Sequence, residues 1–244
     1  MKPLDWDRTT EFIRQEVVEF HEKRINRLRE TKLKDILKKN PYLFRAKNLL
    51  TASDLIQSML DARLSSSEEK MFGDLLERVV IFIAQQTLDG RKSSTRGIDL
   101  DFEKDNTRYL VSIKSGPNWG NSSQYQSLRL NFKNAVKVIR QADTRTHVQP
   151  VLGICYGKAL NADAGDYIKL VGQSFWDFIS DTPTLYLDII EPISHKAKSY
   201  NETMMSTRSA IENRLIKEFT TDYCDDVGNI EWEKLVSFTS KNIK

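Results

Sequence analysis

Apolar residues recur at helical intervals among charged residues through the first ninety positions. This spacing predicts one helix over residues 5–39, which should end at Asn40-Pro41 because the residue before a proline avoids the helical region. A second helix is expected over residues 51–64. The serine-rich run that follows it is expected to cap a third helix, which ends near residue 87. The first third of the chain is therefore predicted to be helical.

Beyond residue 90 the apolar pattern changes from helical spacing to alternation. Residues 98–114 predict a β-hairpin that turns at Asp105-Asn106, a favourable turn pair. The continuous apolar run over 148–156 is typical of a strand buried on both faces. The other predicted elements are a polar loop over 115–123, a helix over 125–141, a strand over 167–171, a short helix over 174–179 and mainly helical structure over 181–244.

This order of elements predicts the fold class. Strands in the middle of the chain, with helices before, between and after them, indicate an α/β fold with a mixed central β-sheet flanked by helices. We expect a helical N-terminal region over residues 1–64, a core over 65–180, and a helical C-terminal region over 181–244 packed on the core.

The composition is that of an ordinary globular protein. Of the 244 residues, 39% are hydrophobic and 29% are charged, and no apolar run approaches the roughly 18 residues of a membrane span. The first residues lack the apolar stretch of a signal peptide, and the two cysteines lie far apart in sequence. We therefore expect a cytoplasmic protein with reduced cysteines; a single disulfide is the alternative.

Positive charge is concentrated in one segment. The net charge is only +3, but residues 21–47 hold ten Lys or Arg residues, Arg45 and Lys47 among them, against three acidic ones. Such a stripe suits a phosphate backbone, so we expect the N-terminal region over residues 1–64 to contact the DNA backbone or to form a dimer. A solvated helix face is the alternative. The three histidines lack ligand-like spacing and no Gly-rich phosphate loop occurs, which argues against zinc sites and against a nucleotide cofactor.

The alternating pattern fixes one hairpin register, because a slip of one residue would mix its two faces. On the apolar face the facing pairs are Ile98–Ile113, Leu100–Val111 and Phe102–Tyr109. On the polar face, which also carries Asp101, Asp99 meets Ser112 and Glu103 meets Arg108 as an opposite-charge pair.

Asp99 and Lys114 converge at one end of this hairpin. Lys114 lies diagonal to Asp99, at a backbone separation of about 7–8 Å that a long side chain can span. A carboxylate can bind Mg²⁺, which prefers oxygen ligands and acidifies a bound water. A lysine can orient or deprotonate that water and offset negative charge in the transition state. The pair therefore indicates phosphodiester hydrolysis; an amphipathic hairpin with a solvated face is the alternative.

Two neighbouring features favour hydrolysis. A long polar loop with one Trp, which we expect to be exposed, follows the hairpin, and such loops are usually functional. Glu77 stands among apolar neighbours in a predicted helix, so its carboxylate either pairs with Arg78 or Arg63 or points to a polar site. Glu77 is therefore a candidate metal ligand.

At these residues the chain resembles the PD-(D/E)XK nucleases, whose motif places an acid on one hairpin strand and (D/E)-x-K on the next. Asp99 matches the first acid and Lys114 the lysine. The stretch from Ser112 to Gln124 resembles one group in particular, the EcoO-type and PmeII-type restriction endonucleases. Further segments similar to this group lie at residues 39–48, 65–77 and 152–158, so the resemblance spans about residues 39–171.

The chain departs from the family pattern at one position. The second acid falls on Ser112, which cannot bind a metal ion as a carboxylate does. Some members of the superfamily take an acid from a neighbouring helix, so Glu77 is the first candidate replacement and Asp101 the second. The resemblance also implies that the backbone carbonyl of Ile113 supplies a metal oxygen. We therefore expect the catalytic residues to be Asp99, Lys114, Glu77 and Ser112, with Mg²⁺ held by Asp99, Glu77 and Ile113.

The resemblance further implies a homodimer that encloses a short, GG-N-CC-like palindrome, with a companion DNA methyltransferase, since two-fold protein symmetry matches two-fold site symmetry. Asn and Gln side chains can read adenine, and Arg or Lys can read guanine. Candidate DNA contacts in the loop are Asn118, Trp119, Asn121, Ser122, Ser123 and Gln124; candidate phosphate contacts are Arg91, Lys92, Arg96, Arg45 and Lys47. Loops that bond to themselves or are merely solvated are the alternatives.

The sequence therefore predicts a type II restriction endonuclease that hydrolyses duplex DNA with Mg²⁺. A repair or junction-resolving nuclease with the same core is one alternative, and it would nick or degrade many DNAs. A DNA-binding protein that has lost the chemistry is another, favoured by Ser112 and disfavoured by Asp99, Lys114 and Glu77. A purely structural interaction protein would leave the polar loop unexplained.

Overall fold

The computed structural model describes residues 1–142 and 145–241, and the chain divides into two compact units. The sheet unit consists of Met1–Val18 and Phe72–His195. The helical unit consists of Glu19–Met71 and the chain from Lys196 onward. Neither unit coincides with one of the three expected regions, whose functional division stays a prediction.

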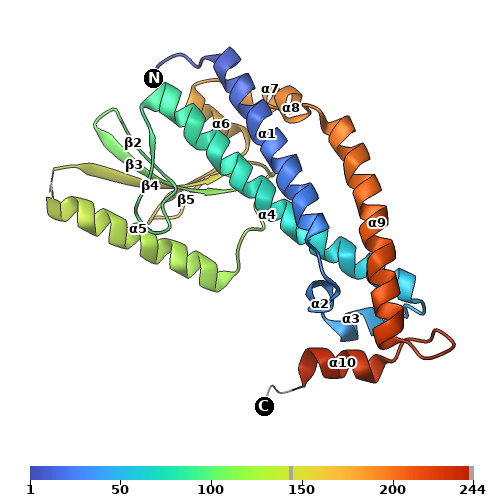
Figure 1. The fold of residues 1–244 in the computed structure, drawn as a ribbon. Coiled ribbons are helices and arrows are strands. Elements are labelled where there is room, and N and C mark those ends of the chain that lie inside the picture. Colours follow the sequence, from blue (N-terminus) through green and yellow to red (C-terminus); the bar gives the residue numbers. More distant parts are fainter. Residues whose placement is uncertain (143–144, 242–244) are drawn as a thin grey trace. The chain divides into compact units, whose positions relative to one another are not determined.

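Six strands form one mixed sheet in the sheet unit, in the order β1-β2-β3-β4-β6-β5 (Figure 1). The neighbours β1, β2 and β3 pair antiparallel, β3, β4 and β6 pair parallel, and β5 pairs antiparallel with β6. The strand bounds are β1 Arg91–Lys92, β2 Leu100–Lys104, β3 Thr107–Lys114, β4 His147–Ile154, β5 Ala162–Asp163 and β6 Ile168–Val171. Helices flank this sheet, so the expected α/β class is confirmed. The strands β1 and β5 were not predicted, because two residues are too few to show alternation.

The hairpin of β2 and β3 has the predicted turn and register. Asp105 and Asn106 both have positive φ, 49° and 59°, as a two-residue hairpin turn requires. The observed pairs include Leu100 with Val111 and Phe102 with Tyr109. β3 also pairs with β4 along its whole length, so the hairpin places its second strand inside the sheet.

The expected contact of Ile98 with Ile113 is wrong. β2 begins only at Leu100, after a turn in which Gly97 has φ +76°. Ile98 therefore leaves the strand alternation and packs with Leu110 and Leu152, on the face that also carries Ser112 and Lys114.

One helix covers that face of the sheet. α5 (Ser122–Ala142) buries Leu128, Phe132 and Ala135 against strand residues such as Leu110 and Leu152. Their spacing of three and four residues places them on one side of the helix. The predicted helix over 125–141 is confirmed, and α5 begins three residues earlier than expected.

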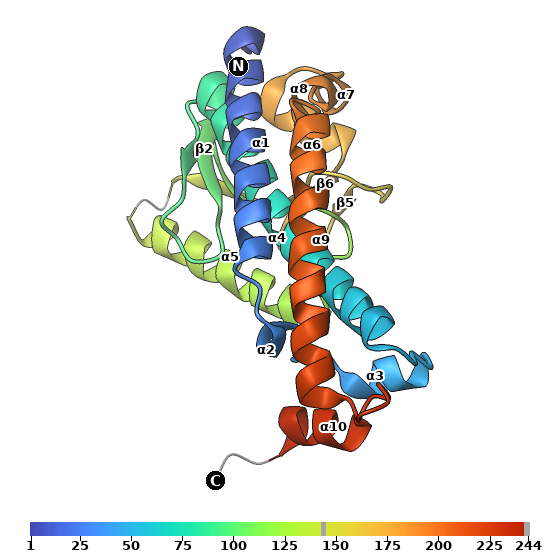
Figure 2. The same ribbon diagram turned by 45° about the vertical axis from the view of Figure 1, so that its right-hand side comes forward.

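Two helices of the sheet unit cover the opposite face. The last turns of α4 (Ala52–Leu88) lie near β2, because Gly90 fits tightly between Leu100 and the Ala84 carbonyl. In α6 (Gln173–Ser180), Phe175 takes the space above Gly153, where an added Cβ would lie 2.1 Å from its ring. The short helices α7 (Leu185–Asp188) and α8 (Ile190–Ile193) follow, and Figure 2 shows them beside α6.

The predicted helix over 5–39 is interrupted. α1 (Trp6–Arg29) ends ten residues earlier than expected, and α2 (Leu33–Ile36) is a separate turn. Asn40 does not simply end a helix. Its side chain accepts a hydrogen bond from the Tyr42 N–H and so caps α3 (Pro41–Ala46), where proline occupies the first turn.

The two helices predicted over 51–64 and 65–87 are one continuous helix, α4. Thr51 caps its start, accepting a hydrogen bond from the Asp54 N–H. The serine run at 65–67 does not cap a new helix. Ser66 instead donates to the Ala62 carbonyl four residues earlier, which lets a serine stay inside a helix.

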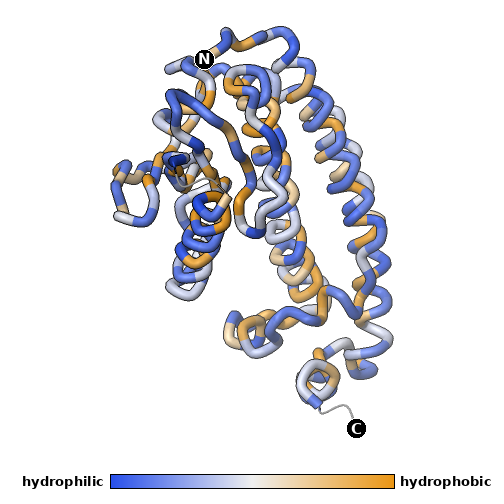
Figure 3. The backbone as a smooth tube through the Cα atoms, turned by 90° about the vertical axis from the view of Figure 1, so that its left-hand side faces the viewer, coloured by the Kyte–Doolittle hydropathy of each residue, from blue (hydrophilic) through white to orange (hydrophobic). Residues whose placement is uncertain are grey.

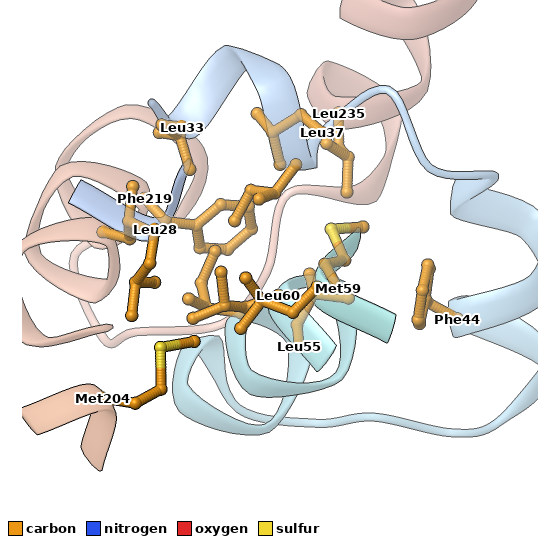
Figure 4. Close-up of a cluster of buried hydrophobic side chains, with 14 of the residues drawn as sticks. Leu28, Leu33, Leu37, Phe44, Leu55, Met59, Leu60, Met204, Phe219 and Leu235 are labelled. Atoms are coloured by element: carbon orange, nitrogen blue, oxygen red, sulfur yellow. The ribbon is translucent and has the colours of Figure 1, made fainter. Parts of the chain in front are cut away.

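Apolar side chains from six helices, α1 and α4 among them, form the core of the helical unit. Figure 4 shows Leu28, Leu60 and Phe219 within this cluster, which α2, α3, α9 (Ala197–Tyr223) and α10 (Trp232–Ser240) complete. The expected mainly helical C-terminal part is therefore confirmed. Figure 3 shows the alternation of apolar and polar positions along the long helices that such one-sided packing requires. In the described residues no helix is long and apolar enough to cross a membrane.

His21 makes the stability of the helical unit dependent on pH. The imidazole is 8% exposed and stacks on the Tyr200 ring at 4.8 Å. Burial lowers the pKa of His21, Arg24 lowers it further, and Glu68 opposes them. The neutral form is therefore favoured in the folded state, and its stabilisation is present above the unfolded pKa of about 6.5 and is lost as pH falls through the folded pKa.

We expect the urea midpoint of unfolding to fall between pH 7.5 and pH 5.5, and His21→Phe, which keeps a ring against Tyr200, to show a smaller fall. Denaturation followed by circular dichroism at both pH values measures this. An equal fall in both proteins would show that His21 is not the titrating group.

Candidate active site

The carboxylate of Asp99 is fixed at the end of β3. The Asp99 N–H donates to the Val111 carbonyl at 2.8 Å, which continues the hairpin one residue before β2 begins. Its Oδ2 accepts hydrogen bonds from the Ile113 N–H at 2.6 Å and from the Ser112 hydroxyl at 3.4 Å. Asp99 therefore caps β3 with its side chain, and the predicted meeting of Asp99 with Ser112 is confirmed.

Lys114 reaches the same point, as the register predicts. Its Nζ lies 3.9 Å from Asp99 Oδ2 and donates to the Ile113 carbonyl at 2.9 Å. The two side chains are 29% and 22% exposed, so the pair is open to a substrate on one side. The Asp99 carboxylate, the Lys114 ammonium group and the Ile113 carbonyl thus converge at the end of β3.

Trp119 holds the lysine from the loop side. Lys114 Nζ lies 5.5 Å from the centroid of the Trp119 ring, within the range of a cation–π contact. The ring also packs against Tyr125 of α5, at 4.6 Å between centroids. The expected exposure of this Trp is wrong, because the loop folds back onto the cluster under α5. Its role as a DNA contact stays a prediction.

Glu77 lies on α4 beside the same end of the sheet. Its carboxylate is 3.5 Å from Lys92 Nζ in β1. One turn earlier, Gly73 lies so close to the loop after β3 that an added Cβ would be 3.6 Å from the Ser115 hydroxyl. The alternative pairing is wrong, because Arg78 bonds to Glu16 and Arg63 lies at Asp35.

Cys155, directly after β4, links Glu77 to the catalytic end electrostatically. Burial and, to a smaller extent, Glu77 raise the pKa of the Cys155 thiol to about 12, and Lys114 opposes the rise. Both side chains therefore act on one buried thiol. Cys155 lies in the family-like segment 152–158, but no motif assigns it a role. The ends of the parallel neighbours β3 and β4 meet at one edge, where the Cys155 N–H donates to the Lys114 carbonyl at 2.9 Å.

Asp101, the second candidate for the missing acid, is committed elsewhere. It is 8% exposed and accepts two hydrogen bonds from Arg108, at 3.0 and 2.6 Å. Glu103 faces Arg108 in the register as predicted, but the guanidinium bonds to the diagonal Asp101 instead. A buried carboxylate gains more from that partner than the exposed Glu103 does.

The residues at this end fit Mg²⁺ in donor chemistry. Asp99 Oδ2 is occupied by its donors, while no described residue donates to Oδ1. The Ile113 carbonyl and Glu77 add further oxygen donors, the ligand type that Mg²⁺ prefers. Among the described residues no group of three or more His, Cys, Asp or Glu could hold a metal ion. An ion here would therefore depend on the carbonyl and on water or substrate oxygens as well.

The polar loop is partly engaged in capping α5. Asn121 Oδ1 accepts from the Gln124 N–H and the Ser123 hydroxyl, and Gln124 Oε1 accepts from the Asn121 N–H. The alternative of a loop that bonds to itself therefore describes these three residues. Asn118 and Ser122 are exposed. DNA contact by the loop stays a prediction; the backbone N–H groups of Asn121 and Gln124 are used in these bonds, which leaves their side-chain NH2 groups for such contacts.

The candidate phosphate contacts lie at three places. Arg91 and Lys92 of β1 are 72% and 70% exposed beside Asp101 and Glu77. Arg96 is exposed in the turn before Asp99. In the helical unit, Arg45 lies over the Trp232 ring and Lys47 over the Phe44 ring. Part of the basic stripe is neutralised there, by the pairs Lys23–Glu19, Arg24–Glu68 and Lys38–Asp35.

A comparison with protein families identifies the family of the chain. The family described as type II restriction endonuclease EcoO109I matches residues 7–201, about four fifths of the chain. No curated protein sequence matches the chain.

If Asp101 is structural, its loss should reduce stability. We expect Asp101→Ala to lower the free energy of unfolding by about 2–3 kcal/mol, because Arg108, whose side chain is only 25% exposed, loses its partner. Glu103→Ala is the matched control on the same strand, with an expected loss under about 0.5 kcal/mol. Urea denaturation measures both, and equal losses would contradict a special role for the Asp101–Arg108 pair.

Proposed function

Because the chain belongs to the EcoO109I family of type II restriction endonucleases, we propose that it is a Mg²⁺-dependent homodimeric enzyme that cuts both strands of duplex DNA at a short palindrome. The observation that carries this proposal is the convergence of Asp99, Lys114 and the Ile113 carbonyl at the end of β3. The family membership supplies the nuclease activity and the DNA substrate, and the site supplies the residues for hydrolysis.

In this proposal Asp99 Oδ1, the Ile113 carbonyl and Glu77 hold the ion. When bound, Mg²⁺ supplies Lewis-acid stabilisation of the negative charge that develops on the phosphate oxygens. Asp99 needs little reorganisation for this task, because the Ile113 N–H and the Ser112 hydroxyl already fix its other oxygen. A fixed carboxylate is what transition-state stabilisation by a preorganised site requires.

Lys114 positions the attacking water and offsets charge. Its ammonium group lies 2.9 Å from the Ile113 carbonyl and 3.9 Å from Asp99, so it faces the same space as the metal donors. From there it can donate a hydrogen bond to a water or to a phosphate oxygen, or accept a proton once it is neutral. Trp119 limits the orientations of the long side chain and so reduces the entropy lost on substrate binding.

Ser112 keeps only part of the role of the missing acid. Its hydroxyl donates to Asp99 but brings no negative charge, so the site has one carboxylate fewer on β3. We infer that Glu77 compensates from α4, because Gly73, one turn earlier on that helix, lies against Ser115, the residue that follows Lys114. Asp101 cannot take this role without breaking its two bonds to Arg108.

The DNA site follows from symmetry. A two-fold dimer presents two copies of the site to two strands, and a palindrome presents the same sequence to each. The resemblance to the EcoO-type restriction endonucleases suggests a GG-N-CC-like site and a companion methyltransferase that protects host DNA. A catalytically impaired DNA-binding protein is the second candidate, because Ser112 replaces an acid.

Incubation of the purified protein with phage DNA, with Mg²⁺ or with EDTA, tests the proposal. We expect discrete bands with Mg²⁺ only, and none from Asp99→Ala, which should still bind DNA because it loses a charge that repels phosphate. A smear would indicate a non-specific or repair nuclease. Intact DNA with folded wild-type protein would favour the binding-only candidate.

Glu77 can be tested against an acid on the same helix. We expect Glu77→Ala to slow single-turnover cleavage by about 10²–10³-fold, the usual cost of one group that stabilises transition-state charge. Asp74→Ala, which removes an exposed carboxylate three residues earlier, should cut at the wild-type rate. If Glu77→Ala also cuts normally at every Mg²⁺ concentration, Glu77 is not the replacement acid.

A further inference from the structure

α5 concentrates positive charge next to the site. Its 21 residues include four Lys or Arg residues and no Asp or Glu. The whole chain has a net charge of only +3. The rest of the protein is therefore slightly acidic, and this one helix carries an unusual excess of positive charge.

Three of these cations lie together on the solvent side of α5. Lys133, Lys137 and Arg140 are exposed and follow one another at four and three residues, so they form one strip, here called the α5 ridge. Leu128, Phe132 and Ala135 point the opposite way, into the sheet. The fourth cation, Arg129, is paired with Asp166 and lies over the Tyr167 ring.

The α5 ridge lacks any counter-charge within the described part of the chain. Its three residues form no ion pair with a described residue. Like charges four residues apart destabilise a helix slightly, and acidic neighbours usually relieve this. A helix that keeps three unrelieved cations in a row therefore suits an anionic partner outside the chain.

The first turn of α5 lies near the catalytic residues, because Trp119, which contacts Lys114, packs against Tyr125 of this helix. Its first turn carries Gln124 of the polar loop, and the turn before Asp99 packs against its middle: a Cβ on Gly97 would lie 2.2 Å from Asn131 Nδ2. Between this turn and α5 lies a hollow of about 720 Å³, lined by polar side chains such as Arg96 and Asn134 and by apolar ones such as Leu130 and Val138. An anion at Asp99 and Lys114 that extends along α5 would meet Arg96 first and the ridge next.

We propose that the α5 ridge binds the sugar-phosphate backbone of the DNA that flanks the cleaved bond, a proposal that rests on the proposed function. Lys133 and Arg140 are about 10 Å apart along the helix axis. Over the same length of duplex axis, one DNA strand presents about three phosphates, since each strand has one phosphate per roughly 3.4 Å of axis. Three cations therefore match three phosphates, and such contacts position the duplex without reading its sequence.

A double variant, Lys133→Gln with Lys137→Gln, tests the proposal, since glutamine removes charge but keeps helix propensity. Lys198→Gln with Lys217→Gln, on exposed positions of α9, is the matched control. Fluorescence anisotropy with EDTA over a series of KCl concentrations measures binding to a duplex carrying the mapped site and to a scrambled duplex.

The ridge variant should bind both duplexes more weakly, and its slope of log K against log salt should be shallower by about two, since each phosphate contact contributes about 0.9. The control should match the wild type. An unchanged slope in the ridge variant overturns the inference, and so does a changed oligomeric state with unchanged DNA binding, which would assign the ridge to protein contacts. Wild-type protein that binds neither duplex overturns the proposed function as well.

Discussion

The hydrogen bond from the Ile113 N–H to Asp99 Oδ2, at 2.6 Å, is the contact on which the site depends. β2 begins only at Leu100, so the last amides of β3 lack backbone partners on that side. The Asp99 side chain replaces the missing acceptor. The same bond therefore completes the sheet and places a carboxylate beside Lys114, so structure and proposed chemistry share one constraint.

This constraint also explains how the chain accommodates Ser112. A second carboxylate at that position would lie next to Asp99, and their repulsion would need a metal ion to offset it. Ser112 is only 1% exposed, and its hydroxyl instead donates a hydrogen bond to Asp99. The site therefore has less repulsion between carboxylates. Lys114, which contacts the Trp119 ring, supplies the positive charge for the proposed chemistry.

The hairpin register and the meeting of Asp99 with Lys114 could be predicted because both follow from a period of two and a recognisable turn. The break after Arg29, the continuity of α4 and the position of Ile98 could not, because tertiary packing decides them. The partner of Arg108 was also missed: sequence gives the facing residue, Glu103, while burial decides that Asp101 receives the bonds. Trp119 looked exposed because no local pattern shows that a loop folds back.

Binding of a divalent ion tests the role of Asp99 more directly than DNA cleavage does. Free Mn²⁺, which accepts the same oxygen ligands as Mg²⁺, can be measured by its electron paramagnetic resonance signal during titration of the protein–DNA complex. If Asp99 holds the ion, wild-type protein should remove Mn²⁺ from solution and Asp99→Asn, which keeps an acceptor for the Ile113 N–H, should not. Equal Mn²⁺ binding by the two proteins would contradict the account.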